Sequence, residues 1–477
     1  MQIFRQWPVY VAGRILPAIV GFAGVALYTR LLDPASFGTY ALLLSASFLI
    51  GMIGYTWLRV ASLRMIATVA PADEANLVAT IGLAFAAVSL PVCAVIVFVV
   101  RIYDPELGWA PAFLTAACAV ASGWFELNVA IAQARLRVVA YGLLQTARAL
   151  GAVLGSLALI LAGFKANALL GGFAIGNCAG FGACGLWRNA LRGRFDRELL
   201  RQVFQFGWPS SVASLGYFSI TFQRFALGTM GGSALLGIYA AANDFSQQTV
   251  GLLIGTATIA GQPLAFRARD LGSKEQLAEQ MRNNARLIFG VGLPAAAGLM
   301  ALSGSISQVY LGPRFHVHSG TVIAITAAAM LLAGLRGSYF EQVFEIVRDT
   351  RAIAVNATLR VVLTIAFSVW SISRYGAVGA AAAILIAEGI GLVFTVLWAR
   401  RLMHVPIPSQ SWLKVAAATG AMVAVVALLP GRSTVPGLAA AVAIGTVVYG
   451  IVITLTHMRR IRSYLGSFSP ARGLSRS

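Results

Sequence analysis

The chain alternates long hydrophobic runs with short polar breaks, and its first sixty residues show the pattern most clearly. Two apolar runs of about twenty residues, each long enough to cross the hydrocarbon core of a bilayer, flank the break DPASFG. Asp33, Pro34 and Gly38 in that break favour a tight turn, so this region is predicted to form a transmembrane hairpin. The alternation continues to about residue 457 and predicts an all-α integral membrane protein with about 14 transmembrane helices.

Composition and charge agree with this prediction. Hydrophobic residues make up 58% of the chain and charged residues only 11%, against about 25% charged residues in a typical soluble domain. The net charge of +20 would suggest nucleic acid as a partner in a soluble protein. Here the basic residues lie in short segments between spans, mostly on the same side of the membrane as the N-terminus. Lys and Arg in such segments determine the orientation of the spans across the membrane. We therefore expect no nucleic-acid partner and both termini in the cytoplasm.

The sequence gives little support for an enzyme. The predicted outer loops, such as YDPELGW and FKANA, are too short to hold a catalytic domain, and no P-loop motif for ATP occurs. The cysteines lie in apolar runs without metal-ligand spacing. They are Cys93, Cys118, Cys178 and Cys184. We expect no metal site and no cofactor.

An internal repeat organises the spans into two halves. Trp7-Pro8 recurs as Trp208-Pro209, and Gly38-Thr39-Tyr40 recurs in similar form as Gly237-Ile238-Tyr239. Because a six-span unit returns the chain to the same side, the copies are predicted to be two parallel six-helix lobes around a central cavity, plus two extra C-terminal helices. The predicted domains are an N-terminal lobe at 1–200, a C-terminal lobe at 201–400, and the last two spans with the cytoplasmic tail at 401–477.

The segments RLLDPASFGTYAL, LGTMGGSALLGIYAAAND and YLGPRF resemble those of polysaccharide-unit flippases in the multidrug/oligosaccharidyl-lipid/polysaccharide exporter superfamily. The resemblance covers nearly the whole chain in span count, loop lengths and duplication. It implies a secondary transporter in the bacterial inner membrane that moves undecaprenyl-pyrophosphate-linked oligosaccharide to the periplasmic leaflet by alternating access. It also implies exopolysaccharide or lipopolysaccharide O-antigen biosynthesis as the pathway. Membrane lipids, a polysaccharide polymerase and a chain-length regulator are the implied partners.

Five arginines inside predicted spans are the candidate substrate-binding residues. An arginine facing lipid at the midplane costs about 2.5–3.5 kcal/mol, so each must line the cavity, pair with an acid or reach the interface. A guanidinium in the cavity would suit a pyrophosphate because it donates two parallel hydrogen bonds. The set is Arg14, Arg148, Arg224, Arg336 and Arg360.

Three acidic residues inside spans are candidates for ion coupling or pairing. Asp244 belongs to a polar band with Asn243, Gln247 and Gln248, and either carries a coupling proton or pairs with Arg224. Glu126 and Glu341 lie near predicted inner ends, where we expect arginines of the adjacent loops to pair with them. The segment SKEQLAEQMRNNAR is predicted to form a helix on the membrane surface.

Two other functions stay open from sequence alone. One is a multidrug or cation antiporter of the same superfamily, although a cationic drug favours carboxylates and the spans hold more isolated arginines than acids. The other is a membrane-bound polysaccharide polymerase or ligase, which needs an active site on the outer side. The short outer loops disfavour it.

Overall fold

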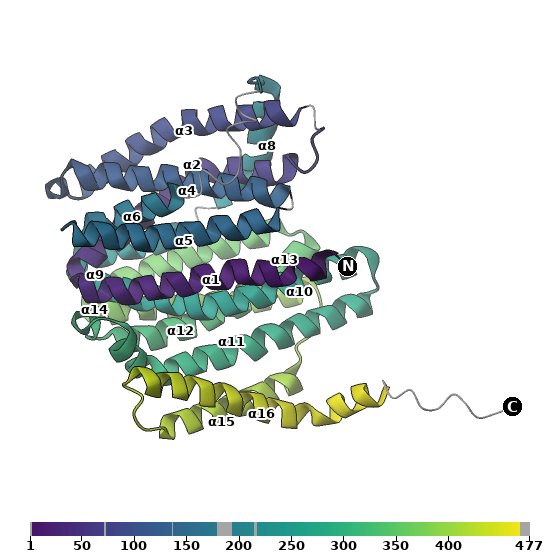
Figure 1. The fold of residues 1–477 in the computed structure, drawn as a ribbon. Coiled ribbons are helices and arrows are strands. Elements are labelled where there is room, and N and C mark those ends of the chain that lie inside the picture. The colour runs from purple at the N-terminus through teal and green to yellow at the C-terminus, as the bar shows by residue number, and fades with distance from the viewer. Residues whose placement is uncertain (1, 71–72, 136, 179–192, 214–216, 468–477) are drawn as a thin grey trace. The chain divides into compact units, whose positions relative to one another are not determined.

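A computed structural model describes residues 2–467 except 71–72, 136, 179–192 and 214–216 (Figure 1). The side chains of residues 2–15 and 457–467, and of a few other helical residues, lie outside this description. Arg14 is among them.

The described residues form helices and connecting turns (Figure 1). The α-helices are α1 (Gln2–Leu31), α2 (Pro34–Met65), α3 (Glu74–Tyr103), α4 (Trp109–Ala134), α5 (Val138–Leu161), α6 (Ala166–Cys178), α8 (Arg197–Ala213), α9 (Phe218–Ser246), α10 (Leu252–Leu271), α11 (Lys274–Tyr310), α12 (Ser319–Leu335), α13 (Gln342–Val347), α14 (Thr350–Leu402), α15 (Ser409–Leu428) and α16 (Val435–Ser467). Short 3-10 turns occupy Pro105–Leu107 and Pro313–Phe315, and π-helical turns occupy Gln247–Gly251 and Arg336–Phe340.

Within the described residues, ten helices are long and apolar enough to cross a membrane. Several carry strongly exposed apolar side chains, such as Leu90 at 75% and Leu161 at 84%. Large apolar side chains exposed along whole helices are expected where lipid is the solvent. The prediction of an all-α, multi-pass membrane protein is confirmed.

Two of the long helices are each a hairpin of two spans. In α9, Gly232 has a left-handed backbone (φ 83°), and in α14 Gly376 does (φ 54°). The Tyr239 hydroxyl donates to Gln223 Oε1 at 2.6 Å, although sixteen residues of straight helix would separate them by about 24 Å. Around Gly376, the Ser371 hydroxyl donates to the Gly379 carbonyl oxygen, eight residues along the chain, at 2.8 Å. The chain therefore reverses at both glycines, and the count of spans approaches the predicted number.

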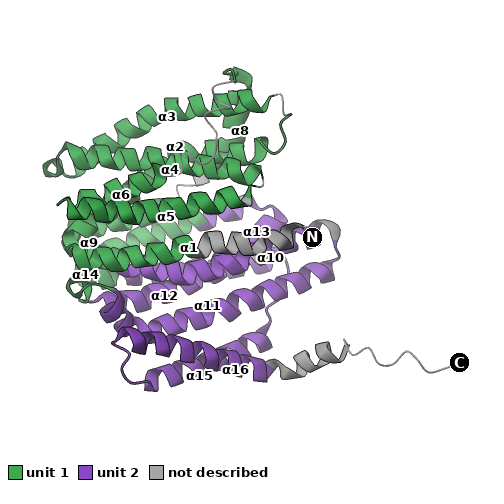
Figure 2. Ribbon diagram, viewed as in Figure 1, with its two compact units in different colours: residues 1–241, 311–317, 357–380 green, residues 242–310, 318–356, 381–477 purple. Residues whose placement is uncertain are grey.

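Packing divides the chain into two compact units (Figure 2). The first, unit 1, comprises residues 1–241, 311–317 and 357–380; the second, unit 2, comprises 242–310, 318–356 and 381–477. The duplicated lobes at 1–200 and 201–400 stay a prediction.

The core of unit 1 lies between α2, α3 and α4. The Tyr55 ring stacks on Phe85 with centroids 4.7 Å apart, and Phe85 contacts Trp124 at 5.2 Å. The Tyr55 hydroxyl donates to Ser89 Oγ at 3.1 Å, which satisfies its polar end inside the apolar core.

The turn between α1 and α2 is fixed by a helix cap. Asp33 accepts hydrogen bonds from the Ser36 backbone N–H at 2.8 Å and from the Ser36 hydroxyl at 2.9 Å. Partial burial raises the pKa of Asp33, but the hydrogen bonds outweigh this effect and hold the pKa below its usual range. Pro34 occupies the first turn of α2, where its missing N–H costs nothing. The predicted turn residues thus start the second helix.

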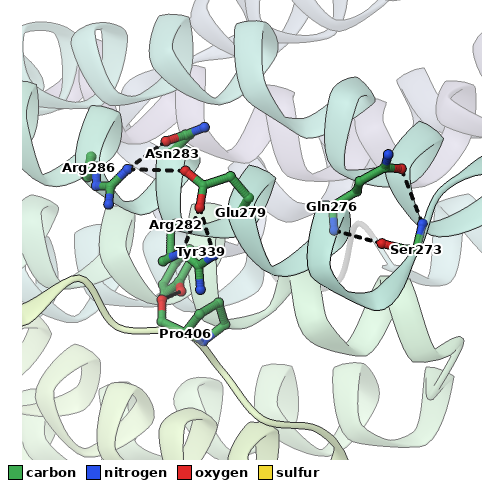
Figure 3. A network of polar contacts seen from close by, with 8 residues as sticks. All are labelled: Ser273, Gln276, Glu279, Arg282, Asn283, Arg286, Tyr339 and Pro406. Carbon is green, nitrogen blue, oxygen red and sulfur yellow. Dashed lines mark hydrogen bonds and ion pairs between the residues drawn. The ribbon is translucent and has the colours of Figure 1, made fainter. Parts of the chain in front are cut away.

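In unit 2, α11 extends well beyond the hydrocarbon core. Its 37 residues span about 55 Å, against a core of about 30 Å. Its first turns carry a polar network in which Glu279 pairs with Arg282 at 2.7 Å and with Arg286 at 3.5 Å (Figure 3). The prediction of a separate surface helix was wrong, because no helix-breaking residue separates this segment from the span that follows.

Side chains tie the last two helices to α11 and to the π-helical turn. The buried Tyr339 donates to the Pro406 carbonyl oxygen, 2.6 Å away, in the segment before α15 (Figure 3). The Tyr449 hydroxyl on α16 donates to the Gly290 carbonyl oxygen at 2.6 Å. Phe289 stacks on Trp412 of α15 with ring centroids 4.6 Å apart.

We predict that Tyr339→Phe lowers the free energy of unfolding by about 0.5–1.5 kcal/mol, because one buried hydrogen bond is lost while the ring is kept. Thermal unfolding of the purified protein in detergent measures the effect. Tyr375→Phe is the matched control, since Tyr375 is 61% exposed. An equal shift in both variants would contradict the structural role of the Tyr339–Pro406 contact.

Candidate functional site

Arg148 on α5 is held loosely by two neighbouring residues of α4. Its Nη1 lies 3.4 Å from Glu126 Oε1, and its guanidinium carbon lies 4.5 Å from the centroid of the Phe125 ring. The side chains of Arg148 and Glu126 are 33% and 44% exposed. A strong charge-assisted hydrogen bond is about 2.7–2.9 Å long, so the contact between Arg148 and Glu126 is longer than a strong ion pair.

Arg148 lies away from the exposed apolar face of α5. The exposed apolar residues of this helix form one stripe: Val139, Leu143, Leu150, Leu154 and Leu161. Arg148 follows Val139 by nine residues, or two and a half turns, which places it on the opposite face.

Arg360 on α14 is not separated from the exposed apolar residues of its helix as Arg148 is. It is half-buried, and the exposed Val369 lies nine residues further along, on the opposite face. The exposed Ile353 lies seven residues before Arg360, on the same face as the arginine, so that face of α14 also carries exposed apolar surface.

Arg336 is clamped between two carboxylates. Its Nε lies 2.7 Å from Glu388 Oε2 and its Nη1 lies 2.6 Å from Glu341 Oε1. The Asn356 side-chain amide donates to the same Glu341 oxygen. The Arg336 side chain is 5% exposed, and it begins the π-helical turn Arg336–Phe340. Both acids neutralise a buried cation here, and the geometry leaves little room for a ligand.

The expected partners of Glu126 and Glu341 were wrong. They pair with the span arginines Arg148 and Arg336, not with arginines of the loops. One loop arginine, Arg135, is itself held by Glu74, with its Nε 2.9 Å from Glu74 Oε1. Pairing inside the membrane neutralises the more costly charges.

Arg224 on α9 is buried at 8% exposure and donates from Nη1 to the Ala41 carbonyl oxygen at 3.2 Å. Its neighbour Gln223 donates to Ser368 Oγ at 3.1 Å and to the Ala380 carbonyl oxygen at 2.7 Å. Hydrophobic patterning alone does not predict this network. The signal available in the sequence was a glutamine next to an arginine inside an apolar span.

Asp244 is half-buried, and the Asn243 side-chain amide lies within 3.4 Å of its Oδ1. The π-helical turn Gln247–Gly251 follows shortly after it. Its predicted roles, ion coupling or pairing with Arg224, stay predictions. Among the described residues, no group of three or more His, Cys, Asp or Glu side chains could hold a metal ion.

Residues 27–319 match a family model described as polysaccharide biosynthesis protein. The chain belongs to this family. The match covers more than half of the sequence and confirms the resemblance that the DPASFG region suggested. No match was found among curated proteins.

The fold of this polysaccharide biosynthesis protein is shared with transporters of the MOP superfamily. The lipid II flippase MurJ in an inward closed conformation superposes with a TM-score of 0.75 at 14% identity, covering 95% of this chain and 99% of that one. An inward-facing multidrug resistance MATE family transporter of the MOP superfamily gives 0.65 at 15% identity, covering 82% and 98%. A MOP superfamily transporter from Pyrococcus furiosus, described by the reverse polarity of its binding pocket, gives 0.52 at 14%, covering 83% and 93%. At these identities the likeness establishes the fold.

We predict that Arg336→Ala destabilises this polysaccharide biosynthesis protein by about 3–5 kcal/mol, because it leaves two carboxylates without their buried cation. Arg148→Ala should cost no more than about 1 kcal/mol, since that pair is partly exposed and long. Unfolding of both variants in the same detergent compares them directly. Equal losses would contradict the division into a structural and an accessible arginine.

Proposed function

We propose that the protein flips an undecaprenyl-pyrophosphate-linked oligosaccharide repeat unit from the cytoplasmic to the periplasmic leaflet of the bacterial inner membrane. The observation that carries this proposal is the family match over residues 27–319. The fold it shares with a lipid II flippase supports the same class of cargo, a sugar on a lipid pyrophosphate. Alternating access moves the head group while the lipid tail stays in the bilayer.

Arg148 is the residue we propose as the first pyrophosphate ligand. The pyrophosphate displaces Glu126, whose ion pair with Arg148 is long and half exposed, and takes two hydrogen bonds from the guanidinium. The Phe125 ring keeps the guanidinium plane in place while its anionic partner changes. Glu126 returns to Arg148 after release, so the empty carrier never holds an unpaired cation.

The remaining predicted site residues take different roles. Arg360 is a half-buried arginine inside a predicted span, and we propose it as a second ligand of the same anion. Arg14 stays a proposed ligand from sequence. Arg336 stabilises the fold through Glu341 and Glu388.

Energy coupling is proposed to involve Asp244. This half-buried carboxylate lies beside a π-helical turn, and such turns often occur at functional sites. Both termini are proposed to be cytoplasmic, from the distribution of Lys and Arg. A polymerase and a chain-length regulator are the proposed partners on the periplasmic side.

A leaflet assay in cells tests the proposal. In a deletion strain, lipid-linked single units should accumulate on the cytoplasmic face, and the wild-type gene should restore them to the outer face. Arg148→Ala should reduce restoration by about tenfold to a hundredfold, because a charged hydrogen bond contributes about 1.5–3 kcal/mol. Arg374→Ala is the matched control, since Arg374 also stacks on a ring, with 4.7 Å between its guanidinium carbon and the Trp370 centroid.

The same assay separates the alternatives. Lipid-linked units that still reach the outer face in the deletion strain would contradict flipping. If those units then remained unpolymerised, the protein would be a polymerase or ligase. The shared fold with a MATE family transporter makes drug export the other alternative, and a change in drug resistance without a change in lipid-linked units would support it.

A further inference from the structure

Helix α8 crosses two spans of unit 1 near the ends that are predicted to be cytoplasmic (Figure 1). At its start, the Asp196 backbone N–H donates to Thr80 Oγ1 of α3 at 3.0 Å. Near its end, Ser211 Oγ accepts from the Trp57 backbone N–H of α2 at 3.2 Å. Thr80 lies six residues after the start of α3, and Trp57 lies eight residues before the end of α2. These positions are about 9 and 12 Å from the helix ends, so α8 changes depth little along its length.

The depth of this crossing places α8 at the boundary of the hydrocarbon core. The 32 residues of α2 span about 48 Å, against a core of about 30 Å. A centred α2 extends about 9 Å beyond the core at each end, so Trp57 lies just inside the boundary. Helix α8 thus has the kind of position that was predicted for the segment SKEQLAEQMRNNAR.

One face of α8 packs against the spans. Val203 is 0% exposed, and a Cβ atom on Gly207 would overlap the Trp57 carbonyl oxygen. The Phe204 ring meets the Trp57 ring edge to face, with centroids 5.4 Å apart. These contacts fix the rotation of α8 about its axis and determine which side chains point away from the protein.

Two arginines and two aromatic residues form a stripe along the exposed side of α8. They follow one another at intervals of four, three and four residues, which puts them on one face of the helix. The stripe consists of Arg197, Arg201, Phe204 and Trp208. Phe204 and Trp208 are 52% and 49% exposed, and the Arg201 side chain is 68% exposed. Cations beside exposed aromatic rings at this depth are typical of a helix that lies in the membrane interface.

Further arginines add positive charge beside this stripe. Arg194, just before α8, is exposed. At the end of α2, the exposed Arg64 places its guanidinium carbon 4.7 Å from the centroid of the Phe206 ring. The region therefore repeats the combination of a cation and an exposed ring on both sides of α8.

The two acids of this segment do not cancel the charge of the arginines. Asp196 accepts hydrogen bonds from the backbone N–H groups of Glu198 at 2.8 Å and Leu199 at 3.2 Å, so it caps the start of α8. Glu198 Oε2 lies 3.9 Å from Arg201 Nη1, and both side chains are more than 60% exposed. Such an exposed and distant pair holds the arginine weakly.

We propose that the stripe of α8 binds an anionic phospholipid of the cytoplasmic leaflet. The lipid phosphate accepts hydrogen bonds from Arg197 and Arg201, and an acyl chain packs along Phe204 and Trp208. A guanidinium donates two parallel hydrogen bonds to a phosphate, and a lipid with net negative charge complements the excess of arginines. A zwitterionic lipid carries its own cation and complements them less well. This binding is separate from the transported cargo and does not depend on it.

Brominated lipids test the site in the full-length protein reconstituted into vesicles. A bimane fluorophore is attached to Gln205→Cys, an exposed position beside the stripe, after the four native cysteines are changed to serine. Bromine quenches bimane on contact. Half-maximal quenching should need at least about fivefold less brominated phosphatidylglycerol than brominated phosphatidylcholine, because one arginine near an anionic lipid changes binding by about this factor.

Arg197→Gln combined with Arg201→Gln should remove this preference. Arg267→Gln combined with Lys274→Gln is the matched control, since it removes the same charge from two exposed positions of unit 2. The control should keep the preference. Phe204→Ser combined with Trp208→Ser should weaken quenching by both lipids, and unchanged quenching would contradict the contact with an acyl chain.

The comparison of the two lipids on the unaltered stripe decides even if a variant fails to assemble. Equal quenching by both lipids would overturn the proposal, as would a preference that survives the loss of Arg197 and Arg201. Absence of quenching by either lipid would also overturn it, because the stripe would then face water or another protein. If undecaprenyl pyrophosphate displaced the brominated lipid far better than unlabelled phosphatidylglycerol, the stripe would bind the cargo and the proposal would be wrong.

Discussion

A guanidinium inside the hydrocarbon core needs an anion, a carbonyl group or an aromatic ring beside it, and this requirement shapes much of the structure. Arg336 meets it with Glu341 and Glu388 in a buried cluster. Arg224 meets it with a backbone carbonyl group. Arg148 meets it with a long ion pair and the face of Phe125, and remains one third exposed. The three arginines look alike in the sequence, yet their neighbours give them different capacities to bind a ligand.

Backbone contact is the second constraint. Gly38 and Gly237 lie so close to opposing carbonyl oxygens that no side chain fits. The same spacing of 199 residues relates both contacts, so equivalent positions of the predicted repeat form both of them. Arg224 corresponds to Val25 in the predicted repeat, and of these two side chains only the arginine carries a hydrogen-bond donor.

The sequence predicted the membrane class, the helical fold and the family, because runs of about twenty apolar residues and the DPASFG turn are local signals. It did not predict that the first turns of α11 continue into the following span, since both possibilities share the same helical pattern. The sequence also led to the wrong prediction that Glu126 and Glu341 form ion pairs with arginines of the loops. The actual partners depend on which helices pack together, and that information is not present in any one segment. The glycine motif was visible as a repeat, but the contact between its two copies was not.

Translocation by the purified protein tests the central claim most directly. The protein is reconstituted into vesicles that carry a fluorescent undecaprenyl-pyrophosphate-linked sugar, and a membrane-impermeant quencher is added outside. The account predicts that wild-type vesicles lose the label of both leaflets, and that vesicles with Arg148→Ala lose the inner-leaflet label much more slowly. Vesicles with Arg374→Ala should behave as wild type. Retention of the inner-leaflet label in wild-type vesicles, as in vesicles without protein, under both a proton and a sodium gradient, would contradict the account.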